Sequence, residues 1–315
     1  MKVLVMGGSY FIGWHLVNNL VRSGHEVVVF NRGTKDRDYP GTVRHIKGDR
    51  NNYVELATAL SDEKVDAVYD LSAFRGEQTE PLVEVFDNKI RHFIHVSTSA
   101  VYLDSSILPI KEDFPVGEHH VWGAYGSAKL ECEQILFKKF SETGFPVTVI
   151  RPSYVYGPEN YIARERFLYE RISRNRPILI PGDGKALLQL GHVYDLVHAM
   201  ISLLGKEKVL GEAYHVSADE YITLNGLTYL VGDIMGHEVN IVNVDPSLYG
   251  YKDRDIFPFD NCTYFTSIDK IRDAIGWKPA YSLRRGFEEG YRIWLNDSDK
   301  VKPDFSNEDD VLSKL

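Results

Sequence analysis

The chain has 315 residues, enough to bury a large core and to form two domains. Its net charge of −9 disfavours nucleic acid or an anionic membrane as the main partner. Two cysteines, Cys132 and Cys262, give neither a disulfide framework nor the spacing of a metal site, and no apolar run approaches membrane length, so we expect a cytoplasmic protein with no metal and no membrane span.

The N-terminal segment predicts the first unit of a dinucleotide-binding fold. Residues 2–6 are predominantly apolar, as in a buried strand, and two glycines end that strand. A helical pattern then runs from Ile12 to Ser23, and residues 26–30 form a second apolar strand. Glycines in such a turn allow close packing, and the free N–H groups at the helix start can face a pyrophosphate. The alternative interpretation is an ordinary strand-to-helix turn.

Tyr10 stands where the usual pattern Gly-x-x-Gly-x-x-Gly has its middle glycine. Its side chain must point away from the pyrophosphate or cover the adenosine side, so the affinity of the site stays open. The turn nevertheless predicts these cofactor-binding residues: Gly7, Ser9, Tyr10, Phe11, Ile12 and Gly13.

Asn31 and Arg32 follow the second strand, where this fold often has an acidic residue that binds the adenine ribose. A neutral Asn31 does not repel a 2′-phosphate, and Arg32 could bind one through two hydrogen bonds. Alternatively, Arg32 is a solvated loop residue and Asn31 bonds a free ribose hydroxyl. The expected cofactor is therefore NAD or NADP.

Alternating strands and helices continue to about residue 155 and predict a parallel, doubly wound sheet with ligands at the C-terminal ends of its strands. We expect strands at 43–47, 67–71, 92–96 and 146–155, and helices at 52–60 and 81–88. Residues that follow these strands are further candidates for cofactor binding: Asp49, Arg50, Leu71, Ser72, Ala73 and Ser97.

Tyr125 and Lys129 are four residues apart at the start of a predicted helix, so they share one helix face. A lysine beside a phenol favours the phenolate and lowers the pKa of the tyrosine, which makes the tyrosine a usable proton acceptor and donor. The spacing is common by chance, and a surface pair is the alternative. In this chain, however, the Tyr125–Lys129 spacing occurs together with the glycine turn, which favours the functional interpretation.

The second half contains further helices and a basic segment at 161–175, which could bind phosphate but is more simply a solvated charged face. The expected domains are 1–157 with 191–218 returning to it, 158–190 with 219–295, and a loose polar tail at 296–315.

Four motifs in one order, with a fifth near the end, resemble the extended short-chain dehydrogenase/reductase family, in its NAD-dependent epimerase/dehydratase group. They are residues 7–13, 96–102, 125–129, 151–158 and 275–279. The resemblance covers about residues 1–295 and implies an α/β protein: a Rossmann sheet and a smaller C-terminal α/β substrate domain. It also implies a small-molecule substrate, most often a nucleotide sugar.

By this resemblance Thr98 is the hydroxyl of the catalytic triad, Tyr125 is its acid and base, and Lys129 is the partner that also binds the cofactor ribose. Pro152 joins the residues that face the cofactor. The implied chemistry is a proton moved by Tyr125 while a hydride passes between a substrate carbon and nicotinamide. Candidate substrate contacts are Phe74, Arg75, Ser99, Tyr154 and Arg166.

Two departures narrow the expected activity. Sugar 4,6-dehydratases of the family have Asp-Glu after the triad hydroxyl, where this chain has Ser99 and Ala100, so dehydration is disfavoured. Leu188 stands where an arginine usually holds the nucleotide pyrophosphate. These features resemble an atypical branch of chloroplast stem-loop-binding proteins and their bacterial relatives.

Two hypotheses follow. The first is an NAD(P)-dependent epimerase or reductase acting on a sugar-like hydroxyl or ketone. The second is a nucleotide- or RNA-binding protein with little catalysis, because plant members of the branch are linked to RNA, although the chain's acidity argues against that role. The family also implies a homodimer through the helix that carries Tyr125.

Overall fold

The computed structural model describes residues 1–297 and 303–315. The chain forms two compact units: unit 1 comprises Met1–Ser153, Val193–Ser217 and Thr266–Lys278, and unit 2 comprises Tyr154–His192, Ala218–Phe265 and Pro279–Leu315. The segment Thr266–Lys278, which the sequence placed in the second domain, therefore belongs to the first. The backbone N–H of Ser267 donates to the Ile110 carbonyl there.

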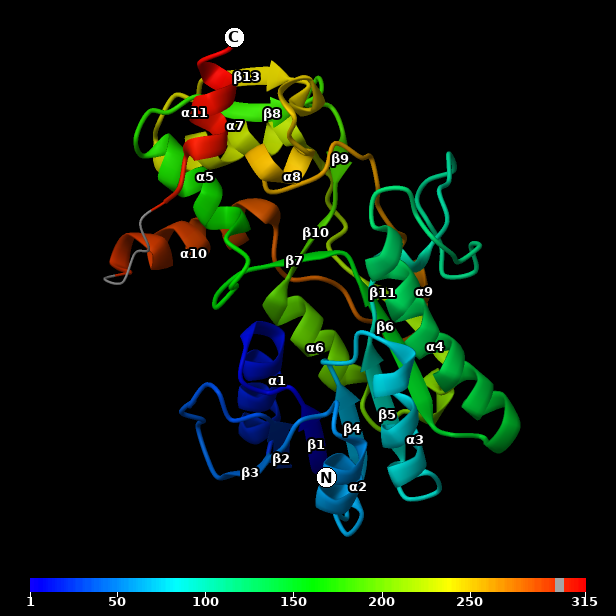
Figure 1. Ribbon diagram of the computed structural model, residues 1–315. Helices are drawn as coiled ribbons and strands as arrows, with labels where there is room; N and C mark the ends of the chain where they lie inside the picture. Colours follow the sequence, from blue (N-terminus) through cyan, green and yellow to red (C-terminus); the bar gives the residue numbers. More distant parts are fainter. Residues whose placement is uncertain (298–302) are drawn as a thin grey trace. The chain divides into compact units, whose positions relative to one another are not determined.

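Unit 1 is built on a seven-stranded sheet with the order β11-β6-β5-β4-β1-β2-β3, and every neighbouring pair is parallel (Figure 1). Its strands are β1 (Lys2–Met6), β2 (Glu26–Asn31), β3 (Val43–Lys47), β4 (Ala67–Asp70), β5 (His92–Val96), β6 (Val147–Pro152) and β11 (Glu212–Val216). The predicted doubly wound Rossmann sheet is confirmed. The chain leaves β1 toward β2 and later returns to β4 on its other side, so the strand order switches beside β1.

Helices cover both faces of this sheet. They are α1 (Phe11–Arg22), α2 (Tyr53–Leu60), α3 (Glu80–Phe86), α4 (Gly123–Thr143), α6 (Val193–Leu203) and α9 (Asp269–Ile275), with short 3-10 turns η1 (Gly76–Gln78), η2 (Ser99–Val101) and η3 (Glu207–Val209). Alternate strand residues such as Leu4 and Met6 pack with Leu56, Leu82 and Leu136 from α2, α3 and α4. On the other face α1 packs against α6.

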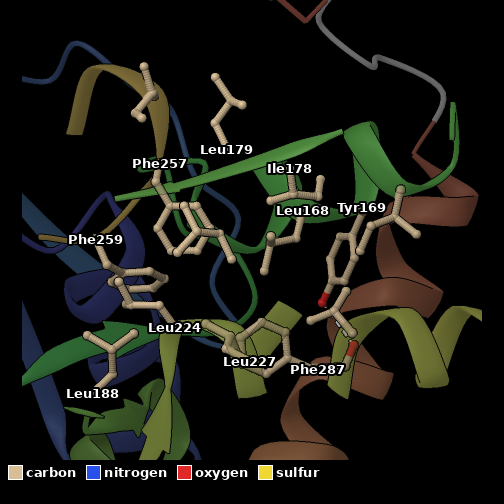
Figure 2. Packing of buried hydrophobic residues seen from close by; sticks show 14 of the residues in the cluster. Leu168, Tyr169, Ile178, Leu179, Leu188, Leu224, Leu227, Phe257, Phe259 and Phe287 are labelled. Carbon is tan, nitrogen blue, oxygen red and sulfur yellow. Dashed lines mark hydrogen bonds between the residues drawn. The ribbon is translucent and has the colours of Figure 1, made fainter. Parts of the chain in front are cut away.

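Unit 2 is a smaller α/β unit with three two-stranded sheets among the described residues. Its elements are β7 (Tyr154–Tyr156), α5 (Arg164–Ile172), β8 (Ile178–Pro181), β9 (Leu187–Leu188), β10 (Leu190–His192), β12 (Ile222–Thr223), α7 (Leu224–Met235), β13 (Ile241–Val244), η4 (Pro246–Tyr249), α8 (Asp253–Ile256), α10 (Leu283–Asn296) and α11 (Ser306–Leu312). Figure 2 shows its core, where Leu168, Ile178, Leu227 and Phe287 meet from four different elements, together with Phe257 just after α8.

The C-terminal segment differs from the expected loose tail. Within the described residues 303–315 it forms α11, whose Val311 is buried in the core of unit 2. Arg171 of α5 pairs with Glu308 of α11, and Arg176 pairs with Asp309. These arginines of the basic segment thus bind an acidic helix of the same chain. The rest of the expected tail, 298–302, lies outside the described residues.

In the described ranges 1–297 and 303–315, no helix combines the length and the apolar character needed to cross a membrane.

Candidate active site

The glycine turn after β1 brings the start of α1 against the end of the strand. Gly7 has φ 95°, and a Cβ on Gly13 would lie 2.1 Å from the Gly7 carbonyl oxygen, so only glycine fits at residue 13. Tyr10 is the N-cap of α1, and its exposed side chain makes no capping hydrogen bond. The first N–H groups of α1 are therefore not capped by Tyr10, and the turn fits a dinucleotide pyrophosphate.

Asn31 ties the end of β2 to this turn. Its Nδ2 donates to Ser9 Oγ at 2.8 Å, and its Oδ1 accepts from the Gly33 N–H at 2.8 Å. Arg32, the next residue, is exposed. The end of β2 thus carries a neutral amide that contacts the turn, followed by an exposed cation.

Arg50, a predicted cofactor-binding residue, lies against the loop after β4. Its guanidinium pairs with Asp70, donates to Ser72 Oγ at 2.7 Å, and donates to the Gln78 carbonyl at 2.8 Å. Burial raises the pKa of Asp70, but the charge and hydrogen bonds of Arg50, together with the charge of Lys129, outweigh that effect and bring the pKa to about 2. Asp70 Oδ1 also accepts from the Ala73 N–H, so Arg50 fixes the loop after β4.

Asp49 likewise serves its own turn, since its Oδ1 accepts from the Asn51 N–H at 3.0 Å. The Leu71 N–H donates to the Met6 carbonyl, which joins the C-terminal ends of β4 and β1. Pro152 is buried at the end of β6, beside Val216 of β11.

Lys129 of α4 bridges the C-terminal ends of two neighbouring strands. Its Nζ donates to the Ala73 carbonyl at 2.7 Å and to the Val96 carbonyl at 2.6 Å, and only 3% of the residue is exposed. Burial lowers the pKa of Lys129 to about 8, with Asp70 opposing that shift. The nearby Phe74 ring lies 5.2 Å from Nζ.

Thr98 and Tyr125 come from η2 and α4, which pack closely. A Cβ on Gly126 would lie 2.1 Å from the Ala100 carbonyl oxygen, so a glycine beside Tyr125 permits this approach. Thr98 Oγ1 accepts from the Ala100 N–H at 3.2 Å, and Tyr125 is 47% exposed. The fold thus brings the segments of the three triad residues to one edge of the sheet.

Ser97 Oγ is buried beside this edge with no hydrogen-bond partner among the residues the structure describes. Such an orphaned hydroxyl at the end of β5 is suited to a bound ligand.

The candidate substrate residues have different surroundings. Phe74 is exposed and its ring centroid lies 6.5 Å from that of Tyr125, whereas Arg75 pairs with Glu77. Ser99 is buried, as are its neighbours Ser97 and Thr98.

In unit 2, Tyr154 donates to Asp260 at 3.0 Å and Arg166 pairs with Glu170. Leu188 lies in the hydrophobic core of this unit (Figure 2). The position of the expected pyrophosphate arginine is thus a packing position here.

Three residues of unit 1 that the sequence analysis did not select hold the glycine turn. Arg37 Nε donates to the Ser9 carbonyl at 2.8 Å, Tyr39 donates to the Gly8 carbonyl at 3.2 Å, and Lys35 lies 5.0 Å from the Tyr10 ring centroid. The signal that could have found them is the alternation of charged residues after β2.

Asp104, His119 and His120 form a group that could hold a metal. The Val121 N–H donates to His119 Nδ1, so the proton of the neutral ring lies on Nε2, the atom that faces Asp104. A hydrogen-bonded cluster explains this geometry without a metal.

Comparisons with known proteins show the family of the chain. The model of the NAD dependent epimerase/dehydratase family matches residues 3–217. The chain is similar to the chloroplast stem-loop binding protein of 41 kDa b of Arabidopsis thaliana, with 34% identity over 99% of this chain and 84% of that protein.

Two solved structures share the fold. The dTDP-glucose 4,6-dehydratase of Bacillus anthracis in complex with NAD has a TM-score of 0.80 at 21% identity, covering 96% of this chain and 99% of that one. The UDP-glucose 4-epimerase of Thermotoga maritima with UDP-glucose has a TM-score of 0.79 at 21% identity, covering 94% and 99%.

Proposed function

This chain belongs to the NAD-dependent epimerase/dehydratase family, and from that premise we propose that it is an NAD(P)-dependent epimerase or reductase acting on a hydroxyl or ketone carbon of a sugar-like substrate. The observation that carries the proposal is Lys129. Its buried ammonium joins the ends of β4 and β5 one helical turn from Tyr125, at the sheet edge where the glycine turn begins α1.

The dinucleotide would be held by the glycine turn and by the loop after β4, and when bound it supplies the hydride chemistry. Tyr125 accepts the proton of a substrate hydroxyl in one direction and returns it in the other. Thr98 hydrogen-bonds the same oxygen and so fixes the reacting carbon. Lys129 provides a positive charge on the helix face of Tyr125, which favours the phenolate.

Dehydration at C4–C6 of a sugar remains disfavoured, although 4,6-dehydratases share the fold. Ser99 and Ala100 are both buried, and neither has an ionisable group that could remove water from a substrate. The substrate class is a nucleotide sugar by analogy with family members, with UDP-glucose and dTDP-glucose as the first compounds to test.

The proposal is tested with Tyr125→Phe and the matched control Tyr53→Phe, an exposed tyrosine at the start of α2. Both variants and the wild type are incubated with NAD or NADP and a panel of UDP- and dTDP-hexoses and simple ketoses, and products are identified by NMR. We expect Tyr125→Phe to lower turnover at least about 100-fold, the usual scale of acid–base catalysis. Full turnover in that variant would contradict the assignment.

A second candidate is RNA binding with little catalysis, favoured by the relative that is named a stem-loop binding protein. Gel-shift titration with a structured RNA across salt concentrations tests it, because phosphate contacts give a steep loss of affinity with salt. Absence of binding at low salt would remove this candidate.

A further inference from the structure

We propose that the adenosine end of the dinucleotide site selects NADP over NAD, through cationic side chains that follow β2, chiefly Lys35 and Arg37. This inference rests on the proposed dinucleotide site, and it concerns which dinucleotide binds there. It goes beyond the family description, which names NAD.

The first observation is what the end of β2 lacks. A carboxylate at this position accepts hydrogen bonds from the ribose hydroxyls of NAD and repels a 2′-phosphate. Here the residue is Asn31, and its amide is already used: Nδ2 donates to Ser9 Oγ and Oδ1 accepts from the Gly33 N–H. The site therefore lacks the usual means of preferring a free ribose.

The second observation is the alternating burial of residues 33–39. Lys35, Arg37 and Tyr39 are half-buried, whereas Asp36 and Asp38 are exposed. In an extended segment alternate side chains point to opposite sides. The two cations and the tyrosine therefore face the glycine turn, and the two carboxylates face solvent.

The third observation is how these side chains meet the turn. Arg37 Nε donates to the Ser9 carbonyl at 2.8 Å, and its guanidinium lies 5.0 Å from the Trp14 ring centroid. Lys35 Nζ lies 5.0 Å from the Tyr10 ring centroid. Both cations are thus fixed beside the residues that would meet the adenosine half of the dinucleotide. The exposed Arg32 adds a third positive charge on the same segment.

The carboxylates of Asp36 and Asp38 are exposed, and two basic side chains lie near the end of β2. His45 lies 3.3 Å from Asn31 Nδ2 through its Nε2, and the stem of Lys47 packs near Gly33. A phosphate dianion recognised by lysine and arginine is a strong, charge-assisted contact. The 2′-phosphate of NADP is the part of the cofactor that matches this charge.

Calorimetric titration of the full chain with NADP and with NAD tests the proposal without any turnover. We expect NADP to bind at least about tenfold more tightly, which corresponds to about 1.4 kcal/mol. In Lys35→Gln and Arg37→Gln the affinity for NADP should fall about tenfold more than the affinity for NAD, since loss of the contacts with the glycine turn weakens both dinucleotides but loss of the charge weakens only NADP. Arg44→Gln, an exposed arginine on β3 that pairs with Glu63, is the control and should change neither affinity.

Equal affinity for the two dinucleotides, or tighter binding of NAD, would overturn the NADP preference and leave the proposed reaction standing. Equal losses for both dinucleotides in Lys35→Gln and Arg37→Gln would also overturn it, since the cations would then only support the turn. Full turnover in Tyr125→Phe together with an intact NADP preference would instead refute the proposed function alone.

Discussion

Lys129 is buried, although a lysine ammonium is among the side chains that water solvates best. Two backbone carbonyls and the carboxylate of Asp70 compensate the lost water only in part, so its pKa falls to about 8 from 10.5. One carbonyl lies in the loop after β4 and the other ends β5, so the same hydrogen bonds that stabilise the charge also place Lys129 beside the predicted cofactor loops. The burial and hydrogen bonding of Lys129 thus set both its position and its pKa.

The lowered pKa of Lys129 predicts a pH dependence of stability. Between about pH 8 and 10.5 the unfolded chain keeps a proton that the folded chain has released, so the free energy of unfolding rises with pH by up to about 1.4 kcal/mol per unit from this group. Urea unfolding of the wild type and Lys129→Met across this range should show that the free energy of unfolding of the wild type increases with pH relative to that of the variant. Lys138→Met, on the exposed face of α4, is the control. A difference between wild type and Lys129→Met that is constant with pH would contradict the prediction.

Gly126 illustrates a second constraint at the scale of one residue. Its Cα faces the Ala100 carbonyl so closely that Gly126→Ala must push α4 away from η2. We expect a loss of stability of about 1–3 kcal/mol, as for overpacked cores, and a loss of turnover because Tyr125 and Thr98 separate.

Gly144→Ala provides the comparison, because Gly144 ends the same helix with φ 75° and has no atom within 4 Å of its would-be Cβ. It should cost about 1 kcal/mol through backbone strain and leave turnover intact. Equal turnover in Gly126→Ala and Gly144→Ala, measured beside urea unfolding, would show that the close approach of α4 and η2 is not needed.

At the scale of elements, α5 and α11 form a charge pair within unit 2. Arg171 of α5 pairs with Glu308 of α11, and Arg176, which follows α5, pairs with Asp309 of α11. The Phe305 ring before α11 also packs near the guanidinium groups of Arg171 and Arg176. The last residues of the chain are therefore part of the fold.

The two ion pairs made by α11 should contribute differently to the free energy of unfolding. Arg171 and Glu308 are both buried, so Glu308→Gln leaves a buried guanidinium without its counter-charge and should lower the free energy of unfolding by about 3–5 kcal/mol. Asp309→Asn removes the more exposed partner of Arg176 and should cost less than about 1 kcal/mol. Urea unfolding measures both, and equal costs would contradict the structural role given to Glu308.

At the scale of the whole molecule, local patterns predicted the elements well and long-range partners poorly. Apolar runs such as residues 2–6 and 92–96 gave strands because burial in a parallel sheet requires them. The catalytic triad comes from its motif and stays a prediction. The pairing of Arg50 with Asp70, by contrast, depends on which strands become neighbours, and nothing local signals it. Nothing local signals the pairing of Arg171 with Glu308 either, because the two residues lie 137 positions apart in the sequence.

Part of the candidate site could have been predicted from the sequence but was not. The sequence itself shows that Lys35 and Arg37 alternate with two aspartates. Only the structure shows that Arg37 contacts the glycine turn. Leu188 shows the opposite case, because a substitution in a motif proved to be part of a hydrophobic core. Association of the chain into a homodimer stays a prediction.

The measurement that tests the central claim most directly is dinucleotide binding by the intact protein. The purified chain is denatured, any released dinucleotide is identified by mass spectrometry, and protein found empty is titrated with NADP and NAD. We expect one dinucleotide per chain, either released on denaturation or taken up in the titration. In Gly13→Val we expect no dinucleotide to bind, because a side chain at residue 13 cannot fit against Gly7. A chain that releases no dinucleotide and takes up neither form at millimolar concentration would contradict it.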